Sequence, residues 1–131
     1  MAASPEVPAA HPVRQLWERF EAREWSAAGA VLAGDFVCEW PQTSERFRGP
    51  RNYLAMNQNH PAPNWHITVL RLVDAGDTAA AEVRVISDDG IDICLGFYDI
   101  RDGRLVHAVE YWTNLGTVPT PAWRAEYTER M

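Results

Sequence analysis

The chain has 131 residues, a formal net charge of −6 at pH 7 and a sequence pI near 5.1. Its length is typical of a single domain, and its hydrophobic and charged fractions of 47% and 23% are those of an ordinary globular protein. Nucleic-acid binding needs clustered basic residues, so an acidic chain without a basic stripe argues against that class of partner. All twelve basic residues are arginine, and the absence of lysine excludes Schiff-base chemistry and a phosphate-loop lysine.

Residues 1–11 are rich in Ala and Pro, and we expect them to form a flexible leader before a single domain over residues 12–131. This leader lacks the basic and apolar regions of a secretion signal. No run in the chain approaches the roughly 18 apolar residues that a membrane span requires. We therefore expect a cytoplasmic protein without a membrane partner.

Three helices are predicted in the first half of the chain. From Pro12 onward, apolar residues recur at i, i+3, i+4 and i+7, which places four of them on one face of a first helix. These four are Val13, Leu16, Trp17 and Phe20. A second, short helix is expected over residues 27–34 and a third over residues 51–60, where the pair His60-Pro61 ends it.

Strands dominate the second half. One early strand is expected over residues 35–40, and four later segments separated by short turns with Asp and Gly predict an antiparallel meander over 65–74, 78–87, 91–100 and 104–114. This order predicts an α+β fold, a cone-shaped barrel of three N-terminal helices packed on a strongly curved, mostly antiparallel sheet. The open end of such a cone is a natural site for a small hydrophobic molecule.

Three carboxylates lie inside predicted strands: Glu39, Glu82 and Glu110. A carboxylate in an apolar cavity has a raised pKa and can exchange protons near neutral pH. The alternative is that each lies on the solvated face or pairs with an arginine. We expect Glu110 to be the catalytic acid or base, with Glu39 as the second candidate. His107 is a third, because histidine titrates near neutral pH, unless it is a surface or core residue.

Six tryptophans are many for a chain of this length, and most are expected in the core. Some are expected to line the cavity with a flat indole wall, and tyrosines to add a hydroxyl. The ligand-binding candidates of this kind are Trp17, Trp40, Tyr53, Tyr98 and Trp112. For the early strand we expect Trp40 on the cavity wall and Glu39 on the opposite face, since side chains alternate along a strand.

Two arginines, Arg46 and Arg48, follow the early strand. They are candidates for holding a carboxylate or enolate oxygen at the cavity mouth, or else for pairing with Glu39 and Glu45 and fixing the loop. No His-x-His or His-Glu-x-x-His spacing is present, so we expect no metal ion and no cofactor.

The order of elements and two motifs resemble the nuclear transport factor 2-like superfamily and, within it, the SnoaL-like (polyketide cyclase-like) group. The first motif is a Trp-Pro-Gln run followed by Glu-Arg and Arg-Gly, which this chain matches at Trp40, Pro41, Gln42, Glu45, Arg46, Arg48 and Gly49. The second is Glu110-Tyr111-Trp112, after which the group tends to have an Asp where this chain has Asn114.

This resemblance implies a cone-shaped (cystatin-like) protein, usually a homodimer, with a ligand pocket inside the cone. Members of the superfamily include ketosteroid isomerases, polyketide cyclases, limonene-epoxide hydrolases, dehydratases and binding domains without activity. Where there is chemistry, a cavity Asp, Glu or His transfers a proton. Since Asn114 cannot do so, the resemblance leaves it a hydrogen-bonding role towards the ligand and favours Glu110 with Trp112.

From these patterns we expect an acid–base enzyme of the isomerase, cyclase, dehydratase or epoxide hydrolase type. The alternative is a ligand-binding or dimerisation module without chemistry, which Asn114 favours. A role as an interaction partner in transport rests on the superfamily name alone.

Overall fold

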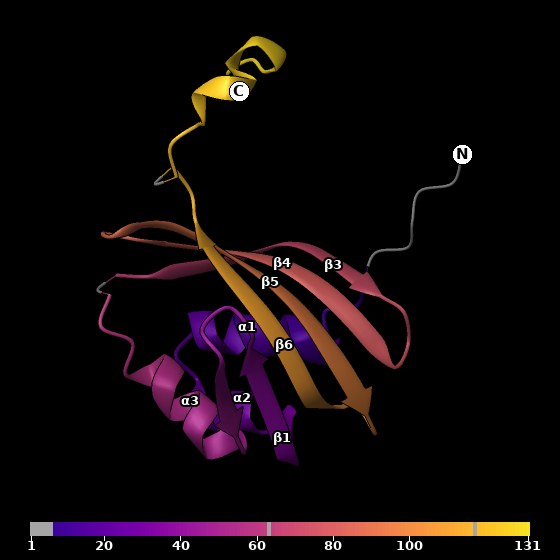
Figure 1. The fold of residues 1–131 in the computed structure, drawn as a ribbon. Coiled ribbons are helices and arrows are strands. Elements are labelled where there is room, and N and C mark those ends of the chain that lie inside the picture. Colours follow the sequence, from indigo (N-terminus) through magenta and orange to yellow (C-terminus); the bar gives the residue numbers. More distant parts are fainter. Residues whose placement is uncertain (1–6, 63, 117) are drawn as a thin grey trace.

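The computed structural model describes residues 7–62, 64–116 and 118–131, so residues 1–6 of the expected leader lie outside the described part. Its three α-helices lie against one face of a curved six-stranded sheet (Figure 1). The helices are α1 (Pro12–Glu21), α2 (Trp25–Gly29) and α3 (Pro50–Gln58). The strands are β1 (Leu32–Trp40), β2 (Glu45–Arg48), β3 (His66–Asp74), β4 (Thr78–Ser87), β5 (Gly90–Arg101) and β6 (Arg104–Asn114).

The strands follow the order β2-β1-β6-β5-β4-β3 across the sheet. β1 and β6 run parallel, whereas every other pair of neighbours runs antiparallel. This mixed, strongly curved sheet with helices on one face confirms the predicted α+β fold class. Among the described residues, no helix has both the length and the apolar character that crossing a membrane requires.

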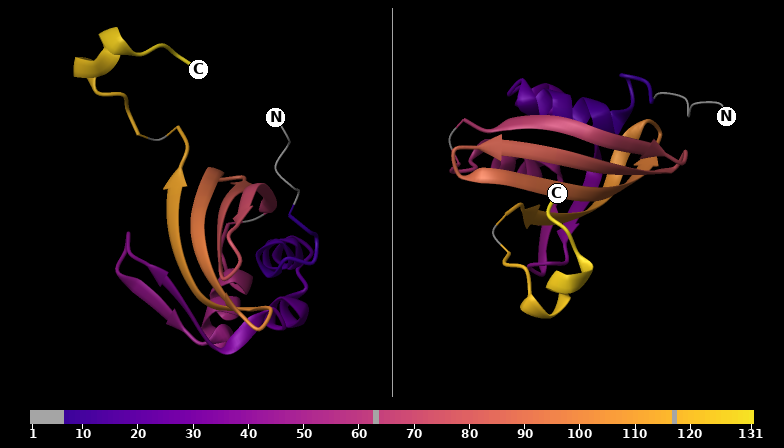
Figure 2. Two further views of the ribbon diagram at one scale, coloured as in Figure 1. Left: turned by 90° about the vertical axis from the view of Figure 1, so that its right-hand side faces the viewer. Right: turned by 90° about the horizontal axis from the view of Figure 1, so that it is seen from above.

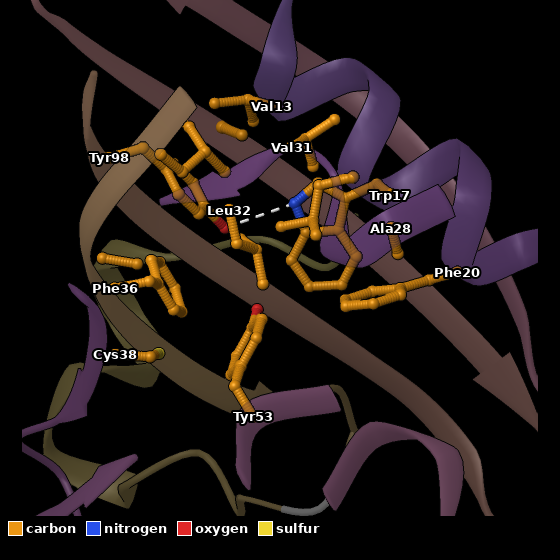
Figure 3. Close-up of a cluster of buried hydrophobic side chains, with 14 of the residues drawn as sticks. Val13, Trp17, Phe20, Ala28, Val31, Leu32, Phe36, Cys38, Tyr53 and Tyr98 are labelled. Atoms are coloured by element: carbon orange, nitrogen blue, oxygen red, sulfur yellow. Dashed lines mark hydrogen bonds between the residues drawn. The ribbon is translucent and has the colours of Figure 1, made fainter. Parts of the chain in front are cut away.

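Helix α1 forms as its apolar periodicity predicts. Pro12 occupies its first turn, and the buried His11 caps the helix because its Nδ1 accepts a hydrogen bond from the Val13 N–H at 3.2 Å. Trp17 and Phe20 on the buried face of α1 join Tyr53 of α3 in one core cluster (Figure 3). His11 Nε2 also lies 3.6 Å from a carboxylate oxygen of Asp74, so the end of the expected leader contacts β3.

The second helix is shorter than predicted, because the chain enters the sheet earlier. α2 ends at Gly29, and β1 begins at Leu32, which pairs with Leu105 of β6. The Leu105 N–H also donates to the Val31 carbonyl at 2.9 Å. This parallel pairing satisfies backbone groups that a longer helix would otherwise have to satisfy.

The segment after Pro41, predicted as a loop, forms a β-hairpin. Strand β2 pairs antiparallel with β1, with Cys38 opposite Phe47. Ser44 in the turn has φ of 58°, a left-handed conformation that suits a tight turn. The hairpin therefore extends the sheet by an edge strand beside α3.

The face of the sheet away from the helices carries exposed apolar side chains. Leu95 and Phe97 of β5 lie opposite Tyr111 and Val109 of β6, and we call these four residues the outer patch. Leu95, Phe97 and Tyr111 are 45%, 53% and 42% exposed. After β6 the chain continues through an unpredicted 3₁₀ helix, η1 (Ala122–Tyr127), on the side of the sheet away from α1 (Figure 2).

Gly96 of β5 makes room for a polar group inside the core. A methyl group at this position would overlap the phenol ring of Tyr98, which lies over it. The cross-strand partner of Gly96 is Glu110. The missing side chain therefore lets the Tyr98 ring lie along the strand, where its hydroxyl reaches the Glu110 carboxylate.

Candidate functional site

Glu110 of β6 is the charged side chain at the centre of the core, with only 1% of its surface exposed. Its Oε2 accepts hydrogen bonds from the hydroxyls of Tyr53 and Tyr98, both at 2.9 Å. Its Oε1 accepts one from Trp40 Nε1 at 3.1 Å and a weaker one from Cys38 Sγ at 3.5 Å. The four donors come from β1, α3 and β5, so the carboxylate connects the layers of the cone.

Burial raises the pKa of Glu110, because removing a carboxylate from water penalises its charged form. The hydrogen bonds from Trp40, Tyr98 and Tyr53 stabilise the charge and oppose this rise. Burial and the nearby Glu110 charge also raise the pKa values of Tyr53 and Tyr98, which keeps both phenols protonated as donors.

A pocket of about 260 Å³ lies next to this network, at the open end of the cone. Its walls are mostly apolar, and four of its lining residues are tryptophans: Trp17, Trp40, Trp65 and Trp112. The polar residues that line it are Asn57, His60, Ser87 and Asp92. Glu110 is not among the lining residues, so it acts on the pocket through its neighbours.

Two of the pocket tryptophans are anchored by the Glu110 network. Trp40 donates its indole N–H to Glu110 directly, whereas Trp17 Nε1 donates to the Tyr98 hydroxyl at 3.2 Å (Figure 3). That hydroxyl donates in turn to Glu110. Both indole N–H groups therefore point into the core, and the carbon surfaces of the rings are left to form the pocket.

Asp92 of β5 is the carboxylate that lines the pocket. One of its oxygens accepts a hydrogen bond from Asn114 Nδ2 at 2.8 Å, and the two residues face each other across β5 and β6. Asn114 therefore holds a carboxylate at the cavity wall. The carboxylate at this end of the cone is thus carried by β5 rather than by the last strand.

His60, just after α3, lines the same pocket. Its Nδ1 accepts a hydrogen bond from the Ala62 N–H at 3.1 Å. This bond places the proton of the neutral ring on Nε2, which can then donate to a ligand oxygen.

Glu39 and His107, the other two catalytic candidates, lie together on the outer face of the sheet. His107 Nε2 is 2.6 Å from Glu39 Oε1, and its Nδ1 is 3.2 Å from Asp99 Oδ2. His107 and Arg46 lower the pKa of Glu39 through hydrogen bonds, so this carboxylate stays ionised. Side-chain alternation separates the pair from Trp40 and Glu110, and the structure does not bring them to the pocket.

The two candidate arginines lie outside the pocket as well. Arg46 forms a two-nitrogen contact with Glu39 Oε2, at 3.2 Å from Nε and 2.9 Å from Nη2. Arg48 is exposed on β2. Of the ligand-binding candidates, Trp17, Trp40 and Trp112 line the pocket, Tyr53 and Tyr98 lie beneath it on Glu110, and Asn114 reaches it through Asp92.

Sequence reasoning missed the polar lining residues Asp92, His60, Ser87 and Asn57. For Asp92 a signal existed, because it shares a strand face with Cys94 and Tyr98, both of which are buried. His60 carried no comparable signal, since its position depends on how the chain after α3 crosses the cone. Among the described residues, no group of three or more His, Cys, Asp or Glu side chains is arranged to hold a metal ion.

Comparison with known proteins identifies the family of the chain. The family model of the SnoaL-like domain matches residues 13–108. The chain belongs to the SnoaL-like domain family. A search of curated protein sequences gives no match.

Solved structures of the same fold include a candidate ketosteroid isomerase from Kribbella flavida, which is 32% identical with a TM-score of 0.82, over 93% of this chain and 89% of that one. An epoxide hydrolase from M. tuberculosis is 19% identical with a TM-score of 0.66, over 83% and 86% of the two chains. A candidate polyketide cyclase from Streptomyces antibioticus, IdmH, is 19% identical with a TM-score of 0.70, over 81% and 92%. The last two similarities show the fold alone.

The pH dependence of stability tests the buried charge in this SnoaL-like domain. The folded state binds the Glu110 proton more tightly than the unfolded state does, because its pKa lies above the ordinary 4.5. The free energy of unfolding therefore falls as the pH rises from 4.5 through the folded pKa. Glu110→Gln removes this slope, since its amide oxygen can accept from Trp40 and its NH₂ can donate to the phenols. Urea unfolding at a series of pH values should show that the free energy of unfolding of the variant increases relative to that of the wild type as the pH rises.

The control is Glu39→Gln, because the pKa of Glu39 is shifted in the opposite direction. Its lowered pKa stabilises the fold above the ordinary value of 4.5, and this contribution is lost as the pH falls through the folded pKa. The free energies of unfolding of this variant and of the wild type should therefore differ least at acidic pH. Equal pH dependence for Glu110→Gln and the wild type would contradict a charge buried at Glu110.

Proposed function

We propose that this SnoaL-like domain binds a small, largely apolar molecule in the tryptophan-walled pocket and transfers a proton on it, as an isomerase, cyclase, dehydratase or epoxide hydrolase does. The single observation that carries this proposal is the Asp92 carboxylate on an otherwise mostly apolar pocket wall, held by Asn114 at 2.8 Å. A general base has to reach the bound molecule, and Asp92 meets this requirement whereas the buried Glu110 does not.

The pocket residues suit the removal of a proton next to a carbonyl group. Asp92 would take the proton from the carbon, and the His60 Nε2–H would donate a hydrogen bond to the carbonyl oxygen as negative charge develops there. Asp92 would then return the proton to another carbon of the conjugated system. A pocket of about 260 Å³ is smaller than the ~300–1,000 Å³ of drug-sized sites, which favours a small substrate.

Glu110 is assigned a positioning role in this proposal. It holds the indole of Trp40 directly and that of Trp17 through Tyr98, so it fixes two walls of the pocket. Binding without chemistry remains the second candidate function. The observation that favours it is Asn114, which stands where the SnoaL-like group tends to have an Asp.

A β,γ-unsaturated ketone tests the proposed proton transfer. With 3-cyclohexen-1-one as the probe, conversion to the conjugated ketone is followed by ultraviolet absorbance. Asp92→Asn should lower kcat by about 10²–10⁴-fold, the usual contribution of a general base, while ligand-induced thermal stabilisation is kept. Asp102→Asn, in the β5–β6 turn, makes the same change of charge away from the pocket and should leave the rate unchanged. Stabilisation by the ketone without any product would instead support binding without chemistry.

We further propose that two copies of the chain form a homodimer through the outer patch. Exposed apolar side chains gathered on one sheet face are typical of protein–protein contact surfaces. The C-terminal segment supports a second copy as the partner, because it extends on the same side of the sheet and exposes Trp123 and Tyr127, at 73% and 76%. A copy packed on the outer patch would lie beside this segment.

Light scattering after size-exclusion chromatography tests the homodimer. The wild type should have twice the 14.8 kDa mass of the chain, and Phe97→Glu should reduce it to a single chain, because it buries an unpaired charge in the contact. Ala55→Glu adds the same charge on exposed α3 and should remain dimeric. A wild type of single-chain mass at micromolar concentration would contradict the proposal.

A further inference from the structure

The pocket tryptophans meet at steep angles and form a corner. The ring centroids of Trp40 and Trp112 are 6.1 Å apart with planes inclined at 62°, and those of Trp17 and Trp112 are 6.3 Å apart at 65°. Trp65, from the segment before β3, also lines the pocket. A group placed in this corner can lie close to two or more aromatic rings at once.

The indole N–H groups of Trp17 and Trp40 are turned away from the pocket. They donate to Tyr98 and Glu110, respectively. Trp112 Nε1 is buried and has no hydrogen-bond partner in the described part of the chain. The corner therefore presents ring carbon to the pocket, and the faces of indole rings carry negative electrostatic potential.

Among the described residues, the lining of the pocket includes one carboxylate, Asp92, and no arginine. The whole chain carries a net charge of −6. Asp92 lies opposite Asn114, two residues along β6 from Trp112, so the carboxylate is beside the aromatic corner. A carboxylate next to several aromatic rings attracts cations and repels anions.

The protein already uses one of these rings to hold a cation. The guanidinium carbon of Arg23 lies 3.3 Å from the centroid of the Trp65 ring, and Arg23 also donates to the Trp65 carbonyl. Arg23 does not line the pocket. This contact orients Trp65, which also lines the pocket.

We propose that the aromatic corner of Trp17, Trp40 and Trp112, with Asp92 beside it, binds a small organic cation that carries a quaternary ammonium group. This inference rests on the proposed function, since it names the class of ligand for the same pocket. A quaternary ammonium group has no N–H to donate, so its attraction to Asp92 leaves the carboxylate available as a proton acceptor. The aromatic rings replace part of the water that such a cation loses on binding.

Two probes of nearly identical shape separate charge from apolar contact. Choline carries a trimethylammonium group, and 3,3-dimethyl-1-butanol carries the neutral tert-butyl group in its place. Isothermal titration of the wild-type protein should give a Kd for choline at least about tenfold lower than that for the alcohol. The reason is that the faces of several aromatic rings attract a cation electrostatically but do not attract a neutral group in this way. This preference should weaken as sodium chloride is added, since salt screens the attraction to Asp92.

Variants with matched controls locate the binding. Trp112→Leu should weaken choline binding by about 5- to 30-fold, the range expected for one partly desolvated ring, while Trp123→Leu in η1 should not change it. Asp92→Asn should weaken choline binding and reduce its salt dependence, and Asp102→Asn, with the same net charge, should do neither. Circular dichroism melting curves establish that each variant is folded, and the two-probe comparison needs no variant.

The outcomes separate this inference from the proposed function. Equal or tighter binding of the neutral alcohol would overturn the ammonium site while leaving an apolar pocket and its ketone chemistry in place. Absence of choline binding at millimolar concentration would overturn it as well, as would choline binding that Trp112→Leu and Asp92→Asn leave unchanged. Loss of ketone turnover in Asp92→Asn tests the base alone and does not depend on choline.

Discussion

A carboxylate in the core of a small protein has to be matched by donors, because an unpaired buried charge costs several kcal/mol. In this chain the carboxylate is Glu110, and the donors are two phenols, an indole and a thiol from three different elements. Each donor is oriented by this requirement. Gly96 follows from it too, since Tyr98 reaches Glu110 only across a position without a side chain. The helices and the sheet are therefore joined at one polar point inside an apolar core.

The pocket depends on the hydrogen-bond network around Glu110. Trp40 lines the cavity and donates to Glu110, and Trp17 lines the cavity and is linked to Glu110 through Tyr98. The hydrogen bonds in the core therefore determine the orientation of both indole rings. Aromatic rings whose polar edges are bound elsewhere present carbon and π surface to a ligand. The pocket then needs few polar groups of its own, and Asp92 and His60 supply them. The orientation of its walls depends on Glu110, whereas the polar groups that line it come from residues on other elements.

The sequence was sufficient for the fold class and for choosing Glu110 among the carboxylates inside strands, but not for β2 or η1. Periodicity located α1 and the meander, and alternation along β1 correctly separated Trp40 from Glu39. The same alternation places His107 on the face opposite Glu110, so it already argued against His107 in the pocket. Asp92 could have been predicted as a pocket residue, because it lies on the same face of β5 as the buried Cys94 and Tyr98. The hydrogen-bond donors of Glu110 could not have been predicted as a set. They come together only when α3, β1 and β5 pack, and no residue spacing within one segment shows this.

Hydrogen exchange at the indole N–H groups tests the link between Glu110 and the pocket walls most directly. In ¹⁵N-labelled protein, the indole protons of Trp17 and Trp40 should exchange far more slowly than that of the exposed Trp123, because buried hydrogen bonds open only in local or global unfolding. Glu110→Leu should speed up exchange at Trp40 relative to the backbone amides of β5. Fast exchange at Trp40 in the wild type, or unchanged protection in Glu110→Leu, would contradict a carboxylate that holds the walls of the pocket.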